Sequence, residues 1–129
     1  MEFVKNYWEL EVYKFSRQLS REIFEVTKKF PKEEMYSLTD QIRRSSRSVG
    51  TQICEAWAKR RYEKHFISKL TDSDGERMET QHWLETALDC SYITKETASY
   101  LLAKCESTGK MLNSMIAKSH LFCKKNDKK

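Results

Sequence analysis

The sequence has few of the residues that make turns. Its 129 residues include three glycines and one proline, whereas charged residues make up 33% and hydrophobic residues 39%. This composition indicates long helices with charged surfaces and argues against a fold of short strands joined by turns. A chain of this length can build one domain around one core. We therefore expect a single all-α domain over residues 1–123 and a basic disordered tail over residues 124–129.

Long apolar segments and targeting signals are also missing. There is no run of about 18 or more apolar residues, so no membrane span is expected. The first residues, MEFVK, lack the basic segment followed by an apolar one that a signal peptide needs, which predicts a cytoplasmic protein. The four cysteines form no CxxC pair, and none has a histidine at a metal-ligand spacing. We expect isolated reduced thiols.

Two short motifs suggest a metal site, and neither fits. The segment DSDG, residues 72–75, does not place its glycine where the spacing of an EF-hand loop requires it. Glu79 and His82 form one Glu-x-x-His pair, whereas a di-metal carboxylate site in a helical bundle needs two. A catalytic role for Cys54, or for Glu79 with His82, has no supporting motif. We therefore expect no metal, no cofactor and no enzymatic activity.

Apolar residues recur at spacings of three and four along four segments. These segments cover residues 8–30, 35–57, 66–88 and 98–122, and the spacing is typical of amphipathic helices. Phe30 precedes the proline, which disfavours helix at that point, and Thr94 can cap the fourth segment. Four such helices with short connections predict an antiparallel up-down-up-down four-helix bundle.

Small and polar residues interrupt two of the apolar stripes. The second segment places Ser45, Ser46 and Gly50 among its inward positions. A glycine inside a helix costs about 1 kcal/mol relative to alanine, so we expect Gly50 to allow close packing against a neighbouring helix. In the third segment, the stripe that includes Met78 continues through three polar residues, Asp74, Arg77 and Gln81. Buried polar groups need partners, which other helices or another subunit could supply.

Charge is distributed unevenly along the chain. The net charge of +5 conceals a basic segment, an acidic segment and a basic end. Residues 41–61 hold six cations and one acid, residues 72–89 hold six acids and one cation, and residues 118–129 hold five lysines and one acid. This alternation points to electrostatic contact between the second and third helices and to cationic surfaces elsewhere.

Three arginines of the second segment have two alternative roles. If the chain doubles back near residue 61, Arg47 lies opposite residue 75, and Arg43 and Arg44 lie opposite residue 79. Asp74, Glu76 and Glu79 fall in that region. Salt bridges between the second and third helices are therefore one interpretation, and contacts with nucleic-acid phosphates are the other.

A second basic cluster, KRRYEK at residues 59–64, has Glu63 as its only nearby acid. Trp57 and Tyr62 could stack on bases beside it, which makes this cluster the better phosphate candidate. A solvated basic turn is the alternative. The candidate nucleic-acid contacts are Lys59, Arg60, Arg61, Lys64, Arg43, Arg44, Arg47, Lys124 and Lys125.

Two motifs carry a resemblance to a known family. The stretch YSLTDQIRRSSRSVGTQICEAWAKRR resembles the central motif of four-helix bundle proteins encoded in intervening sequences of bacterial 23S ribosomal RNA genes, the S23 type. The later stretch METQHWLETALDCSYI resembles the Glu-Thr-Gln motif of the same family. The match runs from about Trp8 to Ile116. It departs from the family at Gln52, where an asparagine is usual, at Gly50, where a proline or small residue is frequent, and at Ser73-Asp74, where a Gly-Ser pair is found.

The resemblance implies an all-α bundle that assembles as a ring, typically a homopentamer, with no known catalytic activity. It also points to a related accessory protein of diversity-generating retroelements, a basic pentameric barrel that associates with a reverse transcriptase and nucleic acid. We therefore expect a non-catalytic homo-oligomer that binds RNA or other nucleic acid through basic faces. The alternative is a protein–protein scaffold or accessory subunit, for example of a reverse transcriptase, whose arginines form salt bridges within or between subunits.

Overall fold

A computed structural model describes residues 4–123, and these residues form helices and no strand. The long helices are α1 (Glu11–Thr27), α2 (Leu38–Ala58), α3 (Glu63–Asp89) and α4 (Lys95–Ala117). Three short 3-10 helices accompany them: η1 (Tyr7–Glu9), η2 (Lys32–Glu34) and η3 (Ser119–Leu121). The predicted all-α class with four helices is therefore confirmed. The tail predicted over residues 124–129 lies outside the described residues.

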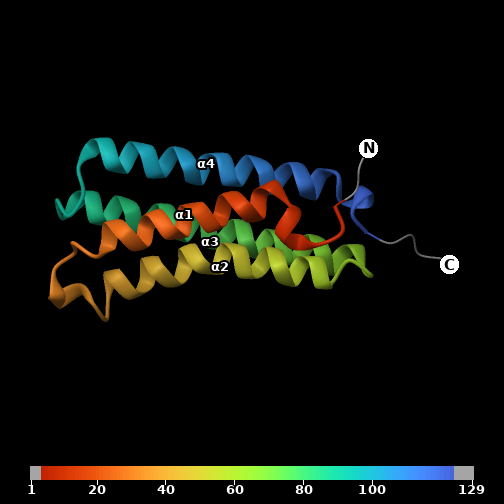
Figure 1. Cartoon of the computed structure of the whole chain (residues 1–129), viewed down its shortest axis with the longest axis horizontal. Coiled ribbons are helices and arrows are strands. Elements are labelled where there is room, and N and C mark those ends of the chain that lie inside the picture. Colours follow the sequence, from red (N-terminus) through yellow and green to blue (C-terminus); the bar gives the residue numbers. More distant parts are fainter. Residues whose placement is uncertain (1–3, 124–129) are drawn as a thin grey trace.

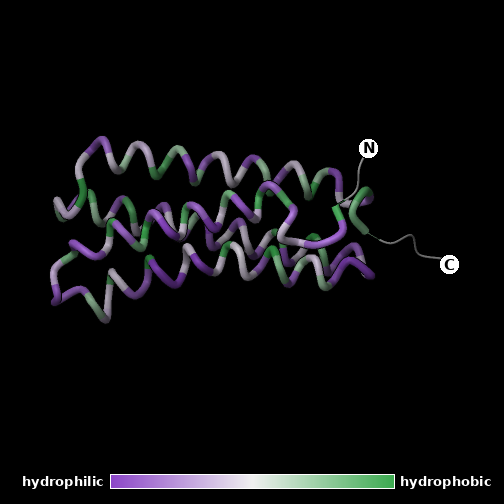
Figure 2. The backbone as a smooth tube through the Cα atoms, viewed as in Figure 1, coloured by the Kyte–Doolittle hydropathy of each residue, from purple (hydrophilic) through white to green (hydrophobic). Residues whose placement is uncertain are grey.

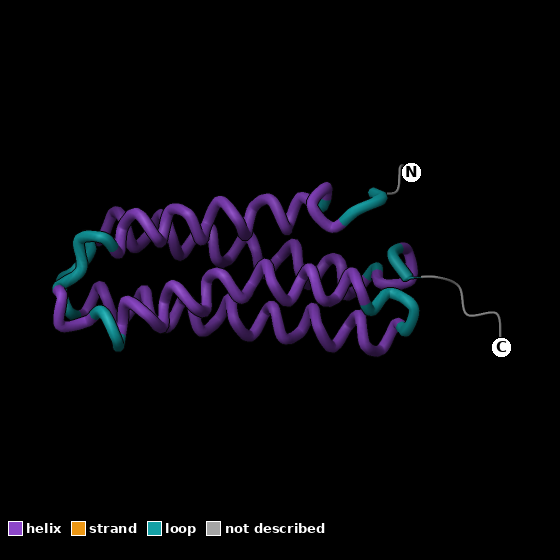
Figure 3. The backbone as a smooth tube through the Cα atoms, turned by 60° about the horizontal axis from the view of Figure 1, so that its bottom comes forward, coloured by secondary structure: helices purple, strands orange, loops and turns teal. Residues whose placement is uncertain are grey.

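The four long helices lie side by side along one axis (Figure 1). The α1–α2 and α3–α4 connections lie at one end of the molecule, and the α2–α3 connection lies at the other (Figures 1 and 3). No helix of residues 4–123 combines the length and the apolar character that a membrane crossing requires.

The helix starts correct two of the predicted core positions. Trp8 precedes α1 in η1 and is 54% exposed, and Met35 precedes α2 and is 51% exposed. Pro31 and the 3-10 turn η2 delay α2 until Leu38, where the Glu34 carboxylate accepts hydrogen bonds from the backbone N–H of Leu38 and the hydroxyl of Ser37. Neither Trp8 nor Met35 therefore lies on the inward face that it would occupy in a helix extended to include it.

The fourth helix begins where the sequence predicts. The hydroxyl of Thr94 accepts a hydrogen bond from the backbone N–H of Thr97 at 3.1 Å, which satisfies one of the free donors of the first turn. Ser91, in the connection before it, has φ 62°, the left-handed conformation that lets the chain reverse within a few residues. At its C-terminal end α4 stops at Ala117, so Leu121 and Phe122 leave the helix. The ring of Phe122 then stacks 6.0 Å from that of Phe66.

The core consists of two apolar clusters, one toward each end of the bundle. One contains Leu19, Ile23, Ile42, Leu84 and Leu101, and the other contains Val49, Ile53, Phe66, Leu70 and Leu112. On each helix, buried small or polar residues lie between the two clusters or at their boundary: Ser16, Ser45, Ser46, Gly50, Ser73, Arg77, Thr80, Thr108 and Gly109. We call this set the polar layer.

Hydrogen bonds within the polar layer join the helices. The hydroxyls of Ser45 and Thr80 lie 2.9 Å apart, and the hydroxyl of Ser73 donates to the carbonyl of Val49 at 2.8 Å. A Cβ at Gly50 would lie 3.2 Å from the Ser16 hydroxyl, so Gly50 allows the predicted close approach of α1 and α2. These contacts tie α2 to both of its sequence neighbours.

Arg77 is the charged member of the polar layer and is only 8% exposed. Its guanidinium donates to Asp74 at 2.7 Å and to Gln81 at 2.6 Å, so its partners come from α3 itself. Gly109 of α4 faces the guanidinium and has no side chain that would occupy its place. The prediction of an inward Met78 was wrong, because Arg77 occupies the stripe and Met78 is 55% exposed.

Candidate nucleic-acid interface

Four cations gather at the α2–α3 turn: Lys59, Arg60 and Arg61 in the connection, and Lys64 in the first turn of α3. α2 ends at Ala58, and α3 begins at Glu63 after a hydrogen bond from the Tyr62 N–H to the Lys59 carbonyl at 3.0 Å. The turn is hydrophilic throughout (Figure 2). Lys59, Arg61 and Lys64 are exposed, and Arg60 is half-buried. Cations just beyond the C-terminus of α2 also face its free carbonyl groups, which favours them electrostatically.

Arg60 is the most constrained of these cations. Its Nε donates to the Trp57 carbonyl at 2.9 Å, and its guanidinium carbon lies 3.6 Å from the centre of the Trp57 ring. Burial lowers the pKa of Arg60, but an arginine stays protonated at neutral pH. Arg61 lies 5.9 Å from the centre of the Tyr62 ring, and this tyrosine is half exposed. Stacking of bases on Trp57 and Tyr62 stays a prediction; Arg60 covers one face of the Trp57 ring.

The acid nearest in sequence to these cations is engaged elsewhere. The carboxylate of Glu63 accepts a hydrogen bond from the hydroxyl of Ser119 in η3. Within residues 4–123, none of the four cations of the turn has a carboxylate oxygen within 4.0 Å. The turn therefore carries an excess of positive charge, and its four cations form no salt bridge with the described residues.

Arg44 forms the salt bridge to α3 that the sequence predicts. Its Nη2 lies 2.6 Å from Glu79 and 3.5 Å from Glu76. The hydrogen bond to Glu79 raises the pKa of Arg44. A hydrogen bond from the indole N–H of Trp83 lowers the pKa of Glu79, and the contact with Arg44 lowers it further. Arg44 is thus committed to the fold, although it remains partly exposed.

The same prediction was wrong for Arg43 and Arg47. Both side chains lie against α1 rather than α3, with guanidinium carbons 4.5 and 5.5 Å from the centre of the Phe24 ring. Arg43 also donates to the Thr27 hydroxyl at 2.8 Å. Asp74, which was expected to face Arg47, bonds to Arg77 within α3. The reason is the position of α1, which covers the flank of α2 from which Arg43 and Arg47 project.

Arg47 also lines a groove between α1 and α2 together with two arginines of α1, Arg17 and Arg21. These two residues are not among the candidates that the sequence predicts. Their spacing of four, the same as that of Arg43 and Arg47, was the available signal, because it places like charges on one helix face. Lys124 and Lys125, the remaining candidates, lie outside the described residues.

The residues considered for metal binding or catalysis have structural partners. DSDG lies inside α3 and is helical. Glu79 is bound to Arg44 and Trp83, and the His82 ring packs 4.7 Å from the Trp83 ring. Cys54 hydrogen-bonds with the hydroxyl of Tyr7, and this contact raises the pKa of Tyr7. Within residues 4–123 there is no cluster of three or more histidine, cysteine or acidic side chains suited to a metal ion.

The helical fold and the cationic turn define a basic four-helix protein. The chain belongs to the 23S rRNA-intervening sequence protein family, whose model matches residues 8–114. It is similar to a solved protein of unknown function from the S23 ribosomal protein family of Bacteroides thetaiotaomicron, with 30% identity and a TM-score of 0.74. That match covers 82% of this chain and 95% of the other. No curated protein matches the chain.

Proposed function

We propose that this chain is a non-catalytic, homo-oligomeric bundle of the cytoplasm that binds RNA through basic faces. The observation that carries the proposal is the α2–α3 turn, where four cations gather and the neighbouring acid is bound to Ser119. Arginine stacked on an aromatic ring, as Arg60 is on Trp57, keeps N–H donors for phosphate oxygens. The family's name, which refers to intervening sequences of 23S rRNA, favours RNA as the nucleic acid.

Assembly multiplies the effect of a small basic surface. In this proposal the helices run in an antiparallel up-down-up-down order, and the bundles form a ring-like homo-oligomer, for which the family resemblance suggests a pentamer. Each subunit would then contribute one basic turn to a shared polyanion-binding surface. Binding by such a surface weakens steeply with salt, because each neutralised phosphate releases counterions.

The test is binding of a labelled RNA hairpin at about 50 and 200 mM salt, a range over which phosphate contacts weaken strongly. The variant K59Q/R60Q/R61Q should bind more weakly, and its plot of log affinity against log salt should be shallower by about 2 to 3. A matched control, K95Q/K110Q/K118Q, removes the same charge from exposed positions of α4 and its C-terminal end. Absence of binding by the unchanged chain at low salt, or an unchanged slope for the turn variant, would reject the proposal.

A second candidate function is a protein–protein scaffold or accessory subunit, for example of a reverse transcriptase. The salt bridges of Arg44 to Glu76 and Glu79 favour it, because they show one arginine of the central motif used for structure. The substitution R47E separates the two functions. Loss of the oligomer in light-scattering measurements would support the scaffold, whereas loss of RNA affinity with an intact oligomer would support RNA binding.

A further inference from the structure

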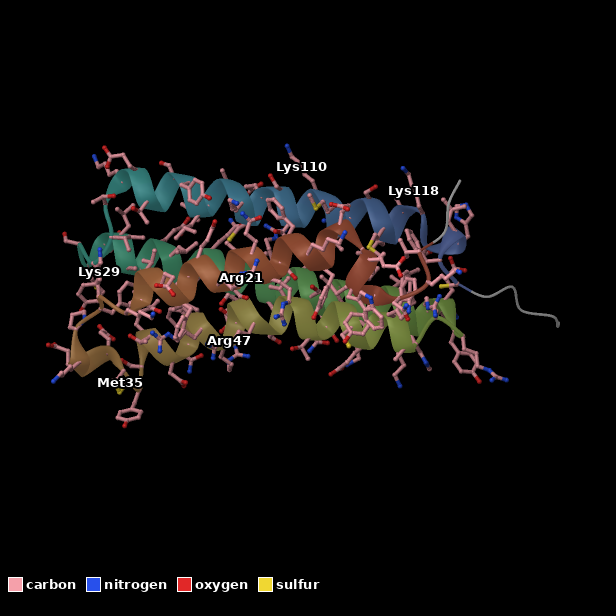
Figure 4. The ribbon with its side chains drawn as sticks, in the orientation of Figure 1. Arg21, Lys29, Met35, Arg47, Lys110 and Lys118 are labelled. Carbon is pink, nitrogen blue, oxygen red and sulfur yellow. The ribbon has the colours of Figure 1, made fainter. Side chains whose placement is uncertain are left out.

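The groove between α1 and α2 gathers positive charge from both helices. It has a volume of about 580 Å³, and three arginines line it: Arg17 and Arg21 from α1, and Arg47 from α2. Figure 4 shows Arg21 and Arg47 on these two adjacent helices. All three side chains are exposed. The groove lies apart from the α2–α3 turn, although its Glu55 end is within about one helical turn of Lys59.

The acids around the groove are already paired. Glu55, the carboxylate that lines it, bonds to Lys69 of α3 at 2.7 Å. Glu25, one turn along α1 from Arg21, pairs with Lys28 at 3.2 Å. Within residues 4–123, none of the three arginines has a carboxylate oxygen within 4.0 Å. The groove therefore holds three positive charges that no described acid neutralises.

The spacing of the arginines suits a chain of anions. Arg17 and Arg21 are four residues apart on α1, and Arg43 and Arg47 are four apart on α2. Such pairs have Cβ atoms about 5–6 Å apart and repel one another unless an anion lies between them. A strand with a phosphate at every step would relieve this repulsion along the α1 wall, where both arginines of the pair line the groove.

The aromatic rings of α1 hold the cations in place. Phe24 lies under Arg43 at 4.5 Å and under Arg47 at 5.5 Å, and Lys28 lies 5.0 Å from the same ring. Contact through the face of a guanidinium leaves its N–H edges free for hydrogen bonds to phosphate oxygens. Ser20 and Thr51 also line the groove, and their hydroxyls donate to the backbone carbonyls of Arg17 and Arg47.

We propose that the α1–α2 groove binds the phosphodiester backbone of an RNA strand, with Arg17, Arg21 and Arg47 as its phosphate contacts. This inference rests on the proposed RNA-binding function and assigns it a second surface. Backbone contacts of this kind position the RNA and do not read its sequence.

The experiment compares three variants that each lose three positive charges. R17Q/R21Q/R47Q tests the groove, K59Q/R60Q/R61Q tests the α2–α3 turn, and K95Q/K110Q/K118Q is the control for net charge. Each is titrated with fluorescently labelled oligouridylate between about 50 and 200 mM salt. The groove variant should lower the slope of log affinity against log salt by about 2, the value for three phosphate contacts on a single strand, relative to the control.

The outcomes separate the groove from the general function. If the groove variant binds like the control while the turn variant loses affinity, the groove proposal fails and RNA binding stands. If the unchanged chain binds no RNA, the proposed function fails, and the groove proposal fails with it.

A second probe distinguishes RNA from an acidic protein. Poly-glutamate is added as a competitor of the labelled oligouridylate at low salt. Weak competition supports RNA as the occupant. Suppose instead that poly-glutamate displaces oligouridylate when the two carry equal concentrations of negative charge, and that the groove variant loses this displacement. That result would assign the groove to an acidic polypeptide and overturn the proposal. So would a change in oligomeric state of the groove variant, measured by light scattering, with RNA affinity unaltered.

Discussion

A single methyl group at position 109 should destabilise the bundle, although it raises helix propensity. A Cβ on Gly109 would lie 2.7 Å from two atoms of the Arg77 guanidinium, too close for the present arrangement. Arg77 is 8% exposed and is bound to Asp74 and Gln81, so a shift of its guanidinium away from α4 disturbs these bonds. The substitution G109A therefore has two opposing effects on stability: alanine favours the helix more than glycine does, and its methyl group disturbs the buried pair of Arg77 and Asp74.

The cost of disturbing the charge pair exceeds the gain in helix propensity. Alanine gains about 1 kcal/mol over glycine inside a helix, whereas separating a buried charge from its partner costs about 3–5 kcal/mol. The net expectation is a loss of about 2–4 kcal/mol in the free energy of unfolding. In the background R77A the clash is absent, and G109A should then stabilise by up to about 1 kcal/mol.

The assay is urea unfolding followed by circular dichroism at one protein concentration, because oligomerisation couples stability to concentration. G75A is the matched control, since Gly75 lies in α3 and a Cβ there would have no neighbouring atom within 4 Å; this variant should be more stable by about 1 kcal/mol. If G109A were as stable as the unchanged chain, or if its effect were the same with and without Arg77, the reasoning about the polar layer would be wrong.

Two further predictions concern the ends of the helices. T94A should destabilise the protein by about 1 kcal/mol in the same assay, because it removes the acceptor of the Thr97 N–H; an unchanged midpoint would show that water replaces the cap. The hydrogen bond of Tyr92 to Glu34 raises the pKa of Tyr92 to about 12, so its stabilising effect is present below about pH 10 and is lost as the pH rises through 12. Bonds from Ser37 and Tyr92 lower the pKa of Glu34, so that contribution is lost at acid pH instead. In thermal melts at alkaline pH, the unchanged chain should lose more stability than Y92F, because only the unchanged chain has this bond to lose. Identical alkaline profiles for both chains would contradict the role of this bond.

Local patterns in the sequence determined the elements of this fold. The three-and-four spacing of apolar residues identifies four helices because a helix must bury one continuous stripe. The cap at Thr94 and the close approach at Gly50 follow from the chemistry of single residues, and both are present. The salt bridge of Arg44 to Glu79 was also predictable, because the register of two helices joined by a short turn follows from counting residues away from the turn.

Other features depend on which helix lies beside a given face. A helical pattern gives the direction in which Arg43 and Arg47 project, but it does not say that α1 and Phe24 lie there. It also cannot choose between Arg77 and Met78 for an inward position, since that choice depends on the space that Gly109 leaves on α4.

The arginine groove shows the same limit most clearly. Arg21 and Arg47 are distant in the sequence and meet only because α1 packs along α2. The sequence by itself therefore determined the helices, their inward stripes and the basic turn at residues 59–64. Tertiary packing alone decided which cations of different helices share a surface, because these charges come together only when the apolar stripes of their helices are buried against one another.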